Sequence, residues 1–494
     1  MKNLFVCFLF LFIAGSLNAQ WQPEVRMTND PTNSYTSFGN ARCIAADGNV
    51  IHVVWYDGVT IGEGNWKIYY KRSTDKGLTW SENVNLSNNV SIAYNPAIAV
   101  SGSYVHVVWY DNRDAIVDAD GNVEEYYKRS SDGGITWGQE IRLTNNIYKS
   151  LHPSIFVSGL NVHLVWNDNR DGNYEVYYKN SLDGGDTWSG DLRLSNTTGK
   201  SWAPTVAVSG SVVHVAWYDS TAGNWEIYYK RSTDGGINWG TDTRLTNNSA
   251  SSEFPTLAVS GSIVHIAWTD GRNGAIPNLY YKRSTNGGIS WGADTKLTSK
   301  NNYNDSYPSL AVNGSTVHLV YHSYRLKNWD IYYRTSNNDG IKWGSDVQLT
   351  SNHGAVNVSS IAVSGSNVHV LFRDYRNGAN SEIYYKRYLG TSLKKDLAAF
   401  EQEEGLPTSF QLMQNYPNPF NPTTTIQVAI PEAGYYALKV YNTLGQEVAE
   451  LVNGQLGVGD YNFNFDASKL SSGLYIYSIK GSNVNISKKM ILMK

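Results

Sequence analysis

Cysteine is almost absent from this chain of 494 residues, which holds only Cys7 and Cys43. Cys7 lies in a segment that we expect to be removed, so Cys43 has no partner for an internal disulfide. Charge of one sign is also lacking, since the formal net charge is -3. That balance gives no basic surface for nucleic acid, which we exclude as a partner. The stability of the chain must therefore come from its packed core.

Long apolar runs are confined to the N-terminus. Lys2 precedes the apolar residues 4–14, and the small residues at 16–19 offer a cleavage site before Gln20. This order is typical of a secretory signal peptide, and the apolar stretch is too short to cross a bilayer. We therefore assign residues 1–19 to a signal peptide and expect no transmembrane segment in the mature chain.

A box of the form Ser-x-Asp-x-Gly-x-Thr-Trp recurs through most of the chain. Its copies occupy residues 73–80, 130–137, 181–188, 232–239, 284–291 and 336–343. A repeat of about 50 residues that carries several short strands is typical of a β-propeller or a similar array. The box side chain that we expect to accept backbone N–H bonds in its own turn is Asp75, Asp132, Asp183, Asp234, Asn286 or Asn338. Because asparagine can cap a turn but cannot act as an acid or base, we interpret the box as structural.

Each repeat contains four β-rich runs separated by Gly, Asn and Asp turns, as in residues 204–210, 213–217, 226–231 and 239–246. Four short strands make one propeller blade. The second run begins with a histidine in seven repeats, at His52, His106, His163, His214, His265, His318 and His369. The sequence therefore predicts an all-β chain with a seven-bladed propeller.

The seventh repeat stops after residues 384–387 and has no box and no fourth strand. Residues 21–29 match residues 137–145, which include a fourth strand. We therefore expect the N-terminal strand to complete the last blade and to close the ring, which removes exposed sheet edges.

The composition changes after Arg387. We predict a propeller over residues 20–388, a linker over 389–409 and a second domain over 410–494. The last segment holds short strands at residues 425–430, 436–441, 461–466 and 473–479, which favour a small β-sandwich.

The boxes resemble the Asp-box, or bacterial neuraminidase, repeats of the sialidase superfamily over residues 21–388. The C-terminus resembles a type IX secretion sorting domain in residues 415–422, 440–446 and 472–475 and in its lysine-rich terminal strand. This second resemblance implies passage through the periplasm and export across an outer membrane by the type IX machinery. It also implies removal of the domain, with release from the cell or attachment to its surface.

Resemblance to sialidases implies an arginine cluster, a Tyr nucleophile paired with Glu, and an Asp acid/base. The candidates recur in most blades, as Arg113 does at Arg170, Arg272, Arg325 and Arg376. A group that recurs in this way favours an ion pair within each blade. Arg42 differs because it replaces the proline of the other repeats, near the point where sialidases place their first carboxylate-binding arginine.

The repeats lose their regularity in blades seven, one and two, where three loops are longer than their counterparts. The resemblance to Asp-box propellers implies that these loops lie on the ligand face, opposite the boxes. Aromatic residues at the start of the inner strands (Tyr94, Trp202, Phe254 and Tyr307) are expected around the channel mouth, where they could stack on sugar rings or equally pack against neighbouring blades. The ligand-binding candidates are Tyr35, Arg42, Asp57, Trp66, Arg113, Asp114, Trp202 and Tyr307.

One of the long loops alternates oxygen-bearing side chains at Asp118, Asp120, Asn122 and Glu124. This spacing is compatible with Ca²⁺, and an Asp-Gly-Asn hairpin turn is the alternative. No other cofactor is expected. The leading hypothesis is a secreted or surface-displayed protein that binds a glycan or a protein surface. The alternatives are an exo-α-sialidase or other glycoside hydrolase, and a structural adhesion module.

Overall fold

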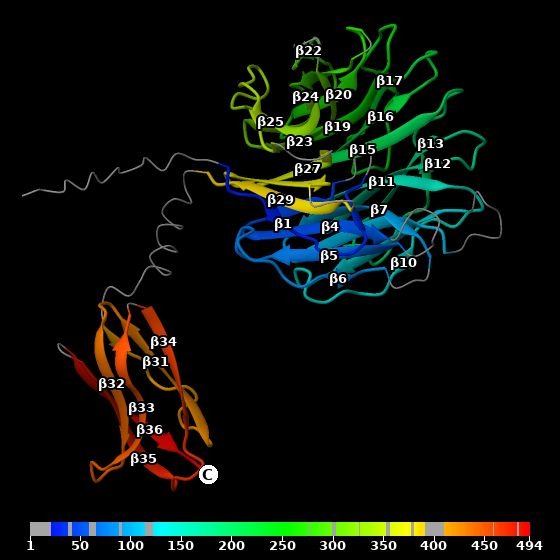
Figure 1. The fold of residues 1–494 in the computed structure, drawn as a ribbon. Helices are drawn as coiled ribbons and strands as arrows, with labels where there is room; N and C mark the ends of the chain where they lie inside the picture. The colour runs from blue at the N-terminus through cyan, green and yellow to red at the C-terminus, as the bar shows by residue number, and fades with distance from the viewer. Residues whose placement is uncertain are drawn as a thin grey trace, which may run out of the picture. The chain divides into compact units, whose positions relative to one another are not determined.

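The computed structural model describes residues 21–37, 42–58, 66–87, 91–113, 122–274, 276–298, 303–325, 327–351, 356–376, 380–390, 410–457, 459–481 and 484–494. The chain divides into two compact units, residues 1–391 and 392–494. Both are built from strands (Figure 1). Within the described ranges, no helix is long and apolar enough to span a membrane.

The described residues of the first unit form seven antiparallel sheets, one for each repeat. From the channel outward, the first sheet contains β2 (Asn33–Tyr35) with β3 (Ile44–Asp47), β4 (Val50–Gly58), β5 (Lys67–Ser73) and β6 (Val84–Asn85), and the second contains β7 (Ala93–Ser101), β8 (Tyr104–Asp111), β9 (Glu124–Ser130) and β10 (Ile141–Arg142). The third contains β11 (Ser150–Ser158), β12 (Asn161–Asp168), β13 (Glu175–Ser181) and β14 (Leu192–Arg193), the fourth β15 (Ser201–Ser209), β16 (Val212–Asp219), β17 (Glu226–Ser232) and β18 (Thr243–Arg244), and the fifth β19 (Ser252–Ser260), β20 (Ile263–Asp270), β21 (Asn278–Ser284) and β22 (Thr295–Lys296). The sixth contains β23 (Asn304–Asn313), β24 (Thr316–Arg325), β25 (Asn328–Ser336) and β26 (Val347–Gln348), and the seventh β27 (Val356–Ser364), β28 (Asn367–Asp374), β29 (Glu382–Tyr388) and β1 (Val25–Arg26).

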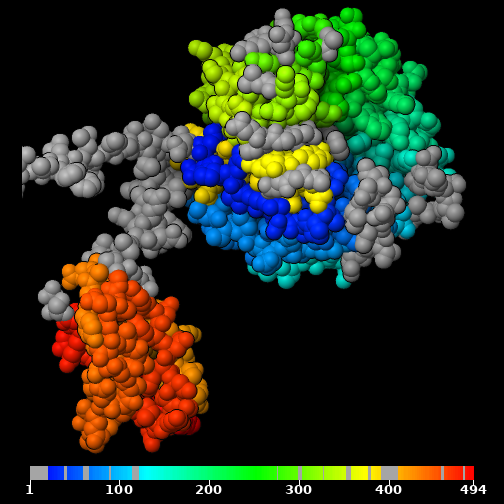
Figure 2. Space-filling view, in the orientation of Figure 1, coloured from blue at the N-terminus to red at the C-terminus, as the bar shows by residue number. Residues whose placement is uncertain are grey.

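The innermost strands surround one channel. Each contacts the innermost strand of the next sheet, and β27 of the last sheet contacts β3 of the first. The N-terminal strand β1 pairs with β29, so that Val25 lies opposite Tyr385, and the blue and yellow segments lie side by side in Figures 1 and 2. The N-terminal strand therefore completes the last sheet, and the propeller is a closed ring.

The innermost strand of the first sheet is split. In the other six sheets this strand is continuous and carries one bulge, with a left-handed residue at Asn95, His152, Ala203, Phe254, Tyr307 or Val358. In the first sheet the bulge is replaced by the residues between β2 and β3, both of which pair with β4. Arg42 therefore follows the split in the innermost strand and lies beside the channel.

The box carboxylates bond within their own turns. Asp132 Oδ1 accepts hydrogen bonds from Ser130 Oγ (2.7 Å), Ile135 N (3.0 Å) and Thr136 N (2.9 Å). These bonds, and one from the Thr136 hydroxyl to Oδ2, hold the pKa of Asp132 well below its usual range. Asn286 Oδ1 likewise accepts from Ser290 N at 2.9 Å. An amide therefore serves this turn as a carboxylate does.

Each box also contacts the preceding blade. The Trp137 ring meets the Tyr70 ring edge-on, with centroids 4.8 Å apart, and Arg72 Nη1 donates to Gly133 O at 2.9 Å. The Tyr70 hydroxyl in turn lies 2.7 Å from His52 Nδ1 inside its own blade. The Trp–Tyr contact recurs around the ring at Trp188–Tyr127, Trp239–Tyr178, Trp291–Tyr229, Trp343–Tyr281, Trp21–Tyr333 and Trp80–Tyr385. The last of these pairs joins the first repeat to the seventh.

The second glycine of the box leaves room for the tyrosine hydroxyl of the preceding blade. A Cβ on Gly134 would lie 1.9 Å from the Tyr70 hydroxyl, whereas a Cβ on Gly133 would meet nothing closer than Arg72 Nη1 at 3.8 Å. Both glycines have positive φ, so both variants carry the same kind of backbone strain. We expect Gly134→Ala to lower the free energy of unfolding by about 2–4 kcal/mol and Gly133→Ala by about 1 kcal/mol. Urea unfolding measures the free energy of unfolding of both variants. Equal decreases in the two variants would contradict a stabilising contact between Gly134 and Tyr70.

The second unit is a small β-sandwich. One sheet contains β30 (Gln411–Leu412), β31 (Thr423–Ile430) and β34 (Gly459–Asp466), and the other contains β33 (Glu447–Leu456), β32 (Gly434–Tyr441), β35 (Gly473–Lys480) and β36 (Asn485–Leu492). Both sheets bury side chains in one core, including Ile426 and Tyr477. The β-sandwich was predicted from the sequence, although its strand β33 was not.

Candidate functional site

The two ends of the propeller channel differ in chemistry. The box turns are hydrogen-bonded to the turns that follow the innermost strands, as from Gly133 N to Ser103 O (2.8 Å). The box end is thus where the innermost strands finish. The opposite end, where they begin, carries rings from six sheets that we call the aromatic collar: Tyr35, Tyr56, Trp66, Tyr94, Tyr110, His152, Tyr174, Trp202, Tyr218, Trp225, Phe254, Tyr307, His322, Tyr324 and Trp329.

In the first sheet the collar is a stack of three rings. The Tyr35 ring lies 5.1 Å from that of Tyr56 and 5.3 Å from that of Trp66, and all three are close to parallel. Strand pairing places Tyr35 opposite Tyr56. The Trp66 ring fits only because residue 58 is glycine, since a Cβ on Gly58 would lie 2.3 Å from the indole. The split innermost strand and this glycine together build the stack.

The collar continues through the next three sheets. Tyr94 contacts Trp66 edge-on at 6.3 Å and Tyr110 at 4.1 Å. His152 lies 6.1 Å from Tyr110 and 5.0 Å from Trp202, measured between ring centroids. The predicted mouth residues Tyr94 and Trp202 therefore belong to one chain of contacting rings.

A second arc runs on from the fourth sheet. Tyr218 contacts Phe254 at 5.4 Å, Phe254 contacts Tyr307 at 4.3 Å, and Tyr307 contacts His322 at 4.7 Å. From the seventh sheet, the guanidinium of Arg373 lies 4.9 Å from the centre of the Tyr35 ring. Arg373 thus connects the seventh sheet to the collar residue Tyr35 of the first sheet.

Burial keeps the collar histidines neutral. It lowers the pKa of His152 to about 4 and that of His322 to about 3, with the positive charge of Arg373 as a second cause for His322. At neutral pH both rings therefore add to the collar as uncharged aromatic groups.

Asp57 lies directly after the collar residue Tyr56. Burial raises the pKa of Asp57 to about 7, although Trp55 Nε1 donates to its Oδ2 at 2.9 Å. Its counterpart Asp168 pairs with Arg170, while the first repeat has Val59 at the position of that arginine. A carboxyl with this pKa can both donate and accept a proton near neutral pH.

One predicted ligand residue, Arg113, belongs to a network of ion pairs inside its blade. Arg113 contacts Asp111 and Glu140, each at 2.6 Å, and stacks on Tyr126. The same pairing with the aspartate two residues earlier holds Arg170, Arg272 and Arg376. The structure thus places Arg113 in the repeated framework and away from the collar. Asp114 lies outside the described residues.

The predicted calcium ligands are only partly described. Glu124 Oε1 accepts hydrogen bonds from Arg142 Nη2 (2.8 Å) and Asn146 N (2.7 Å), and Asn122 donates to Asn146 O at 2.6 Å. Both side chains therefore serve the blade in this structure. Asp118 and Asp120 lie outside the described residues, and no three His, Cys, Asp or Glu side chains of the described part gather as a metal site would require.

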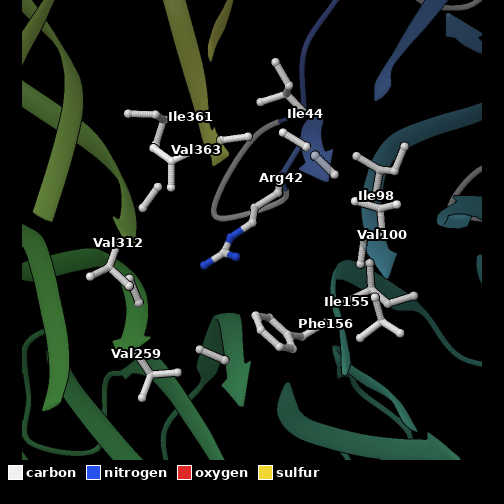
Figure 3. A pocket seen from close by; sticks show the side chains of 18 residues that line it. Arg42, Ile44, Ile98, Val100, Ile155, Phe156, Val259, Val312, Ile361 and Val363 are labelled. Carbon is white, nitrogen blue, oxygen red and sulfur yellow. The ribbon is translucent and has the colours of Figure 1, made fainter. Parts of the chain in front are cut away.

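Arg42 lies inside the channel, as Figure 3 shows. Its backbone carbonyl accepts from Ile98 N at 2.9 Å, and its Nη2 donates to Leu257 O at 2.7 Å. Leu257 belongs to the fifth sheet, so the side chain reaches across the channel from the first. The Arg42 guanidinium therefore faces the channel interior and does not share the stack of Tyr35 and Trp66.

One group of collar residues was not predicted, although the sequence contains a signal for it. The position before the second-strand aspartate, which is Ser323 in the sixth repeat, varies, while the residues around it repeat. It holds Tyr56, Tyr110, Asn167, Tyr218, Thr269, His322 and Arg373 in the seven repeats. Variation at one place in a regular repeat marks the position that faces the collar.

Comparison with known families supports this architecture. Residues 12–205 match the BNR repeat-like domain, and residues 414–493 match the secretion system C-terminal sorting domain. The chain thus carries BNR-type repeats in the first part of its propeller and a type IX sorting domain at its C-terminus. That domain directs export across the outer membrane to the cell surface or the extracellular space.

Among solved structures, the chain is similar to the polysaccharide lyase Uly1, with a TM-score of 0.54, 8% identity and coverage of 75% of this chain and 99% of that one. It is also similar to an ulvan lyase, with a TM-score of 0.50, 11% identity and coverage of 74% and 95%. A mutant Trypanosoma rangeli sialidase with trans-sialidase activity has a TM-score of 0.45, 12% identity and coverage of 95% and 90%. At such identities the two lyase matches show the fold alone. No curated protein matches the chain.

Proposed function

We propose that this exported propeller binds carbohydrate at the aromatic collar. The observation that supports this function is the aromatic collar, whose two arcs of ring contacts together include six sheets at one end of the channel. Its outer members remain partly exposed: Tyr35, Tyr94, His152, Tyr174, Trp202, Trp225, Phe254, Tyr307 and Trp329. Flat aromatic faces that keep contact with solvent suit the apolar faces of sugar rings.

The extent of the collar favours a glycan with several sugar rings. Its exposed members come from six sheets, while a single sugar ring covers only one or two side chains. Behind them, Tyr56, Tyr110, Tyr218 and His322 are buried and hold the outer rings in place. Such support fixes the geometry of a binding surface before the ligand arrives.

The test is the replacement of Trp202, which contacts His152 and Tyr174 edge-on at 5.0 and 4.6 Å. We expect Trp202→Ala to weaken glycan binding about fivefold, since one lost aromatic contact is worth roughly 1 kcal/mol. Affinity electrophoresis and calorimetry on neutral and acidic polysaccharides measure the effect. The matched control is Ile237→Ala in a box turn, where the side chain is 73% exposed and binding should not change. A folded protein that binds no glycan of the panel would contradict the proposal.

Asp57 favours a second candidate function, glycan cleavage. Its raised pKa and its place in the strand directly after the collar residue Tyr56 suit a proton-transfer group, as a carboxyl in an apolar site often is. A sialidase mechanism has less support, because Arg113, Arg170, Arg272 and Arg376 are paired within their blades. The solved lyases named above act on polysaccharides, so such polymers are the first substrates to test. Product release that is lost in Asp57→Asn supports cleavage, and no product from any polymer removes this candidate.

A further inference from the structure

The channel holds a positive charge that no described carboxylate neutralises. Arg42 makes no ion pair with any described residue. Within that part of the chain its side chain donates the hydrogen bond to Leu257 O and lies 5.9 Å from the centre of the Phe156 ring. Residues 38–41, which precede it, are Phe, Gly, Asn and Ala and supply no carboxylate. Burial lowers the pKa of Arg42 only to about 10, so the guanidinium stays charged at neutral pH.

A guanidinium carries five N–H donors arranged as a planar fork. At Arg42 the described residues accept one of them, through the carbonyl of Leu257. The other six repeats have an uncharged residue at this position: Pro96, Pro153, Pro204, Pro255, Pro308 and Ser359. The charge is therefore particular to the first sheet and is not needed to build a blade.

The guanidinium faces a cavity of about 270 Å³. The other residues that line it are alanine, valine, isoleucine and one phenylalanine, contributed by all seven innermost strands. Figure 3 shows Arg42 reaching into this space, with Phe156, Val259 and Val312 around its charged end. A buried charge is stable only when it is paired, and an apolar wall favours a ligand with an apolar part.

We infer that the channel binds a small aliphatic carboxylate, with the carboxylate on the Arg42 guanidinium and the hydrocarbon chain against the valine and isoleucine wall. Carboxylates match the guanidinium fork through two parallel hydrogen bonds. The volume accommodates a chain of a few carbons and not a polymer.

This site is separate from the collar. The cavity wall includes Val100, Val157, Val259, Val312 and Val363, which stand near the ends of their innermost strands. Those ends lead into the turns that bond to the boxes. The cavity therefore occupies the box half of the channel, while the collar lies at the other end, and either site can fail without the other.

Calorimetric titration of the full chain with sodium butyrate tests the inference, with sodium chloride and butanol as controls. We expect saturable binding of butyrate, at least about tenfold tighter than that of chloride, and none of butanol. Arg42→Met should weaken butyrate binding by at least about tenfold, while Arg373→Gln, at the collar, should leave it unchanged.

Because Arg42→Met also removes the bond to Leu257, a second variant tests the cavity itself. Val312→Phe keeps Arg42 and fills the space, so it should abolish butyrate binding in a folded protein. Absence of butyrate binding to the unmodified chain, equal binding of chloride, or full binding by Val312→Phe would each overturn the inference.

Discussion

Acidification from pH 7 to pH 4 is expected to unfold the propeller cooperatively. Seven buried histidines bond to tyrosine hydroxyls inside the blades, in the manner of His214 and Tyr229 at 2.6 Å. Burial lowers the pKa of each to about 3 or 4. In the unfolded chain the same side chains have a pKa near 6.5. Above that pH neither state binds the protons, and below it only the unfolded chain does, so the stability falls as the pH falls from about 6.5 toward 4.

The size of the effect follows from the number of protons. His152 and His322 at the collar raise the number of such histidines to nine. Four buried carboxyls (Asp57, Glu125, Glu253 and Asp305) have raised pKa values and act in the opposite direction. A net uptake of about five protons costs roughly 7 kcal/mol per pH unit, which exceeds within two units the 5–15 kcal/mol that stabilises a typical domain.

Urea unfolding at pH 7.5, 6.5 and 5.5, followed by tryptophan fluorescence, measures this dependence. We expect the free energy of unfolding to fall at each step, with the larger fall between pH 6.5 and 5.5. As a control, His214→Gln should reduce the slope by about one proton, or roughly 1.4 kcal/mol per pH unit. A stability that is constant over this range would show that the histidines are not held neutral.

The regular part of this fold could be predicted from the sequence because the seven copies of the repeat can be aligned with one another. The boxes and the histidine strands locate each sheet, and the match between residues 21–29 and 137–145 correctly predicts that β1 joins β29. The loop lengths also point to the first blade, where the innermost strand is split. Periodic residues are predictable in this way because each blade imposes the same packing on them.

Directions of individual side chains were not predictable in this way. Arg42 and Tyr35 come from the same irregular segment, yet Arg42 enters the channel and Tyr35 enters the collar. Loop length places a residue near one end of the propeller but does not set where its side chain points. Contacts between repeats, such as that of Arg373 with Tyr35, join residues that are distant in sequence. Such contacts depend on closure of the ring.

Glu125 is the residue whose replacement should raise the stability most. It is fully buried at a position that holds an aliphatic residue in the other six repeats: Ile68, Val176, Ile227, Leu279, Ile331 and Ile383. Neither carboxyl oxygen has a hydrogen-bond partner among the residues that the structure describes. Burial, reinforced by the negative charges of Glu124 and Asp168, raises the pKa of Glu125 well above its usual value. At neutral pH the folded state must hold a proton that the unfolded chain releases.

We expect Glu125→Ile to raise the free energy of unfolding at pH 7 by about 2–4 kcal/mol, because it removes a buried polar group without partners and adds apolar burial. The gain should shrink as the pH falls toward 4.5, where the unfolded chain also protonates this glutamate. The adjacent Glu124 is the matched control, since its carboxylate is bonded to Arg142 and to Asn146 N. Glu124→Gln should therefore destabilise the chain by about 1–3 kcal/mol. If Glu125→Ile also destabilised it at pH 7, Glu125 would have to have a partner that compensates its burial.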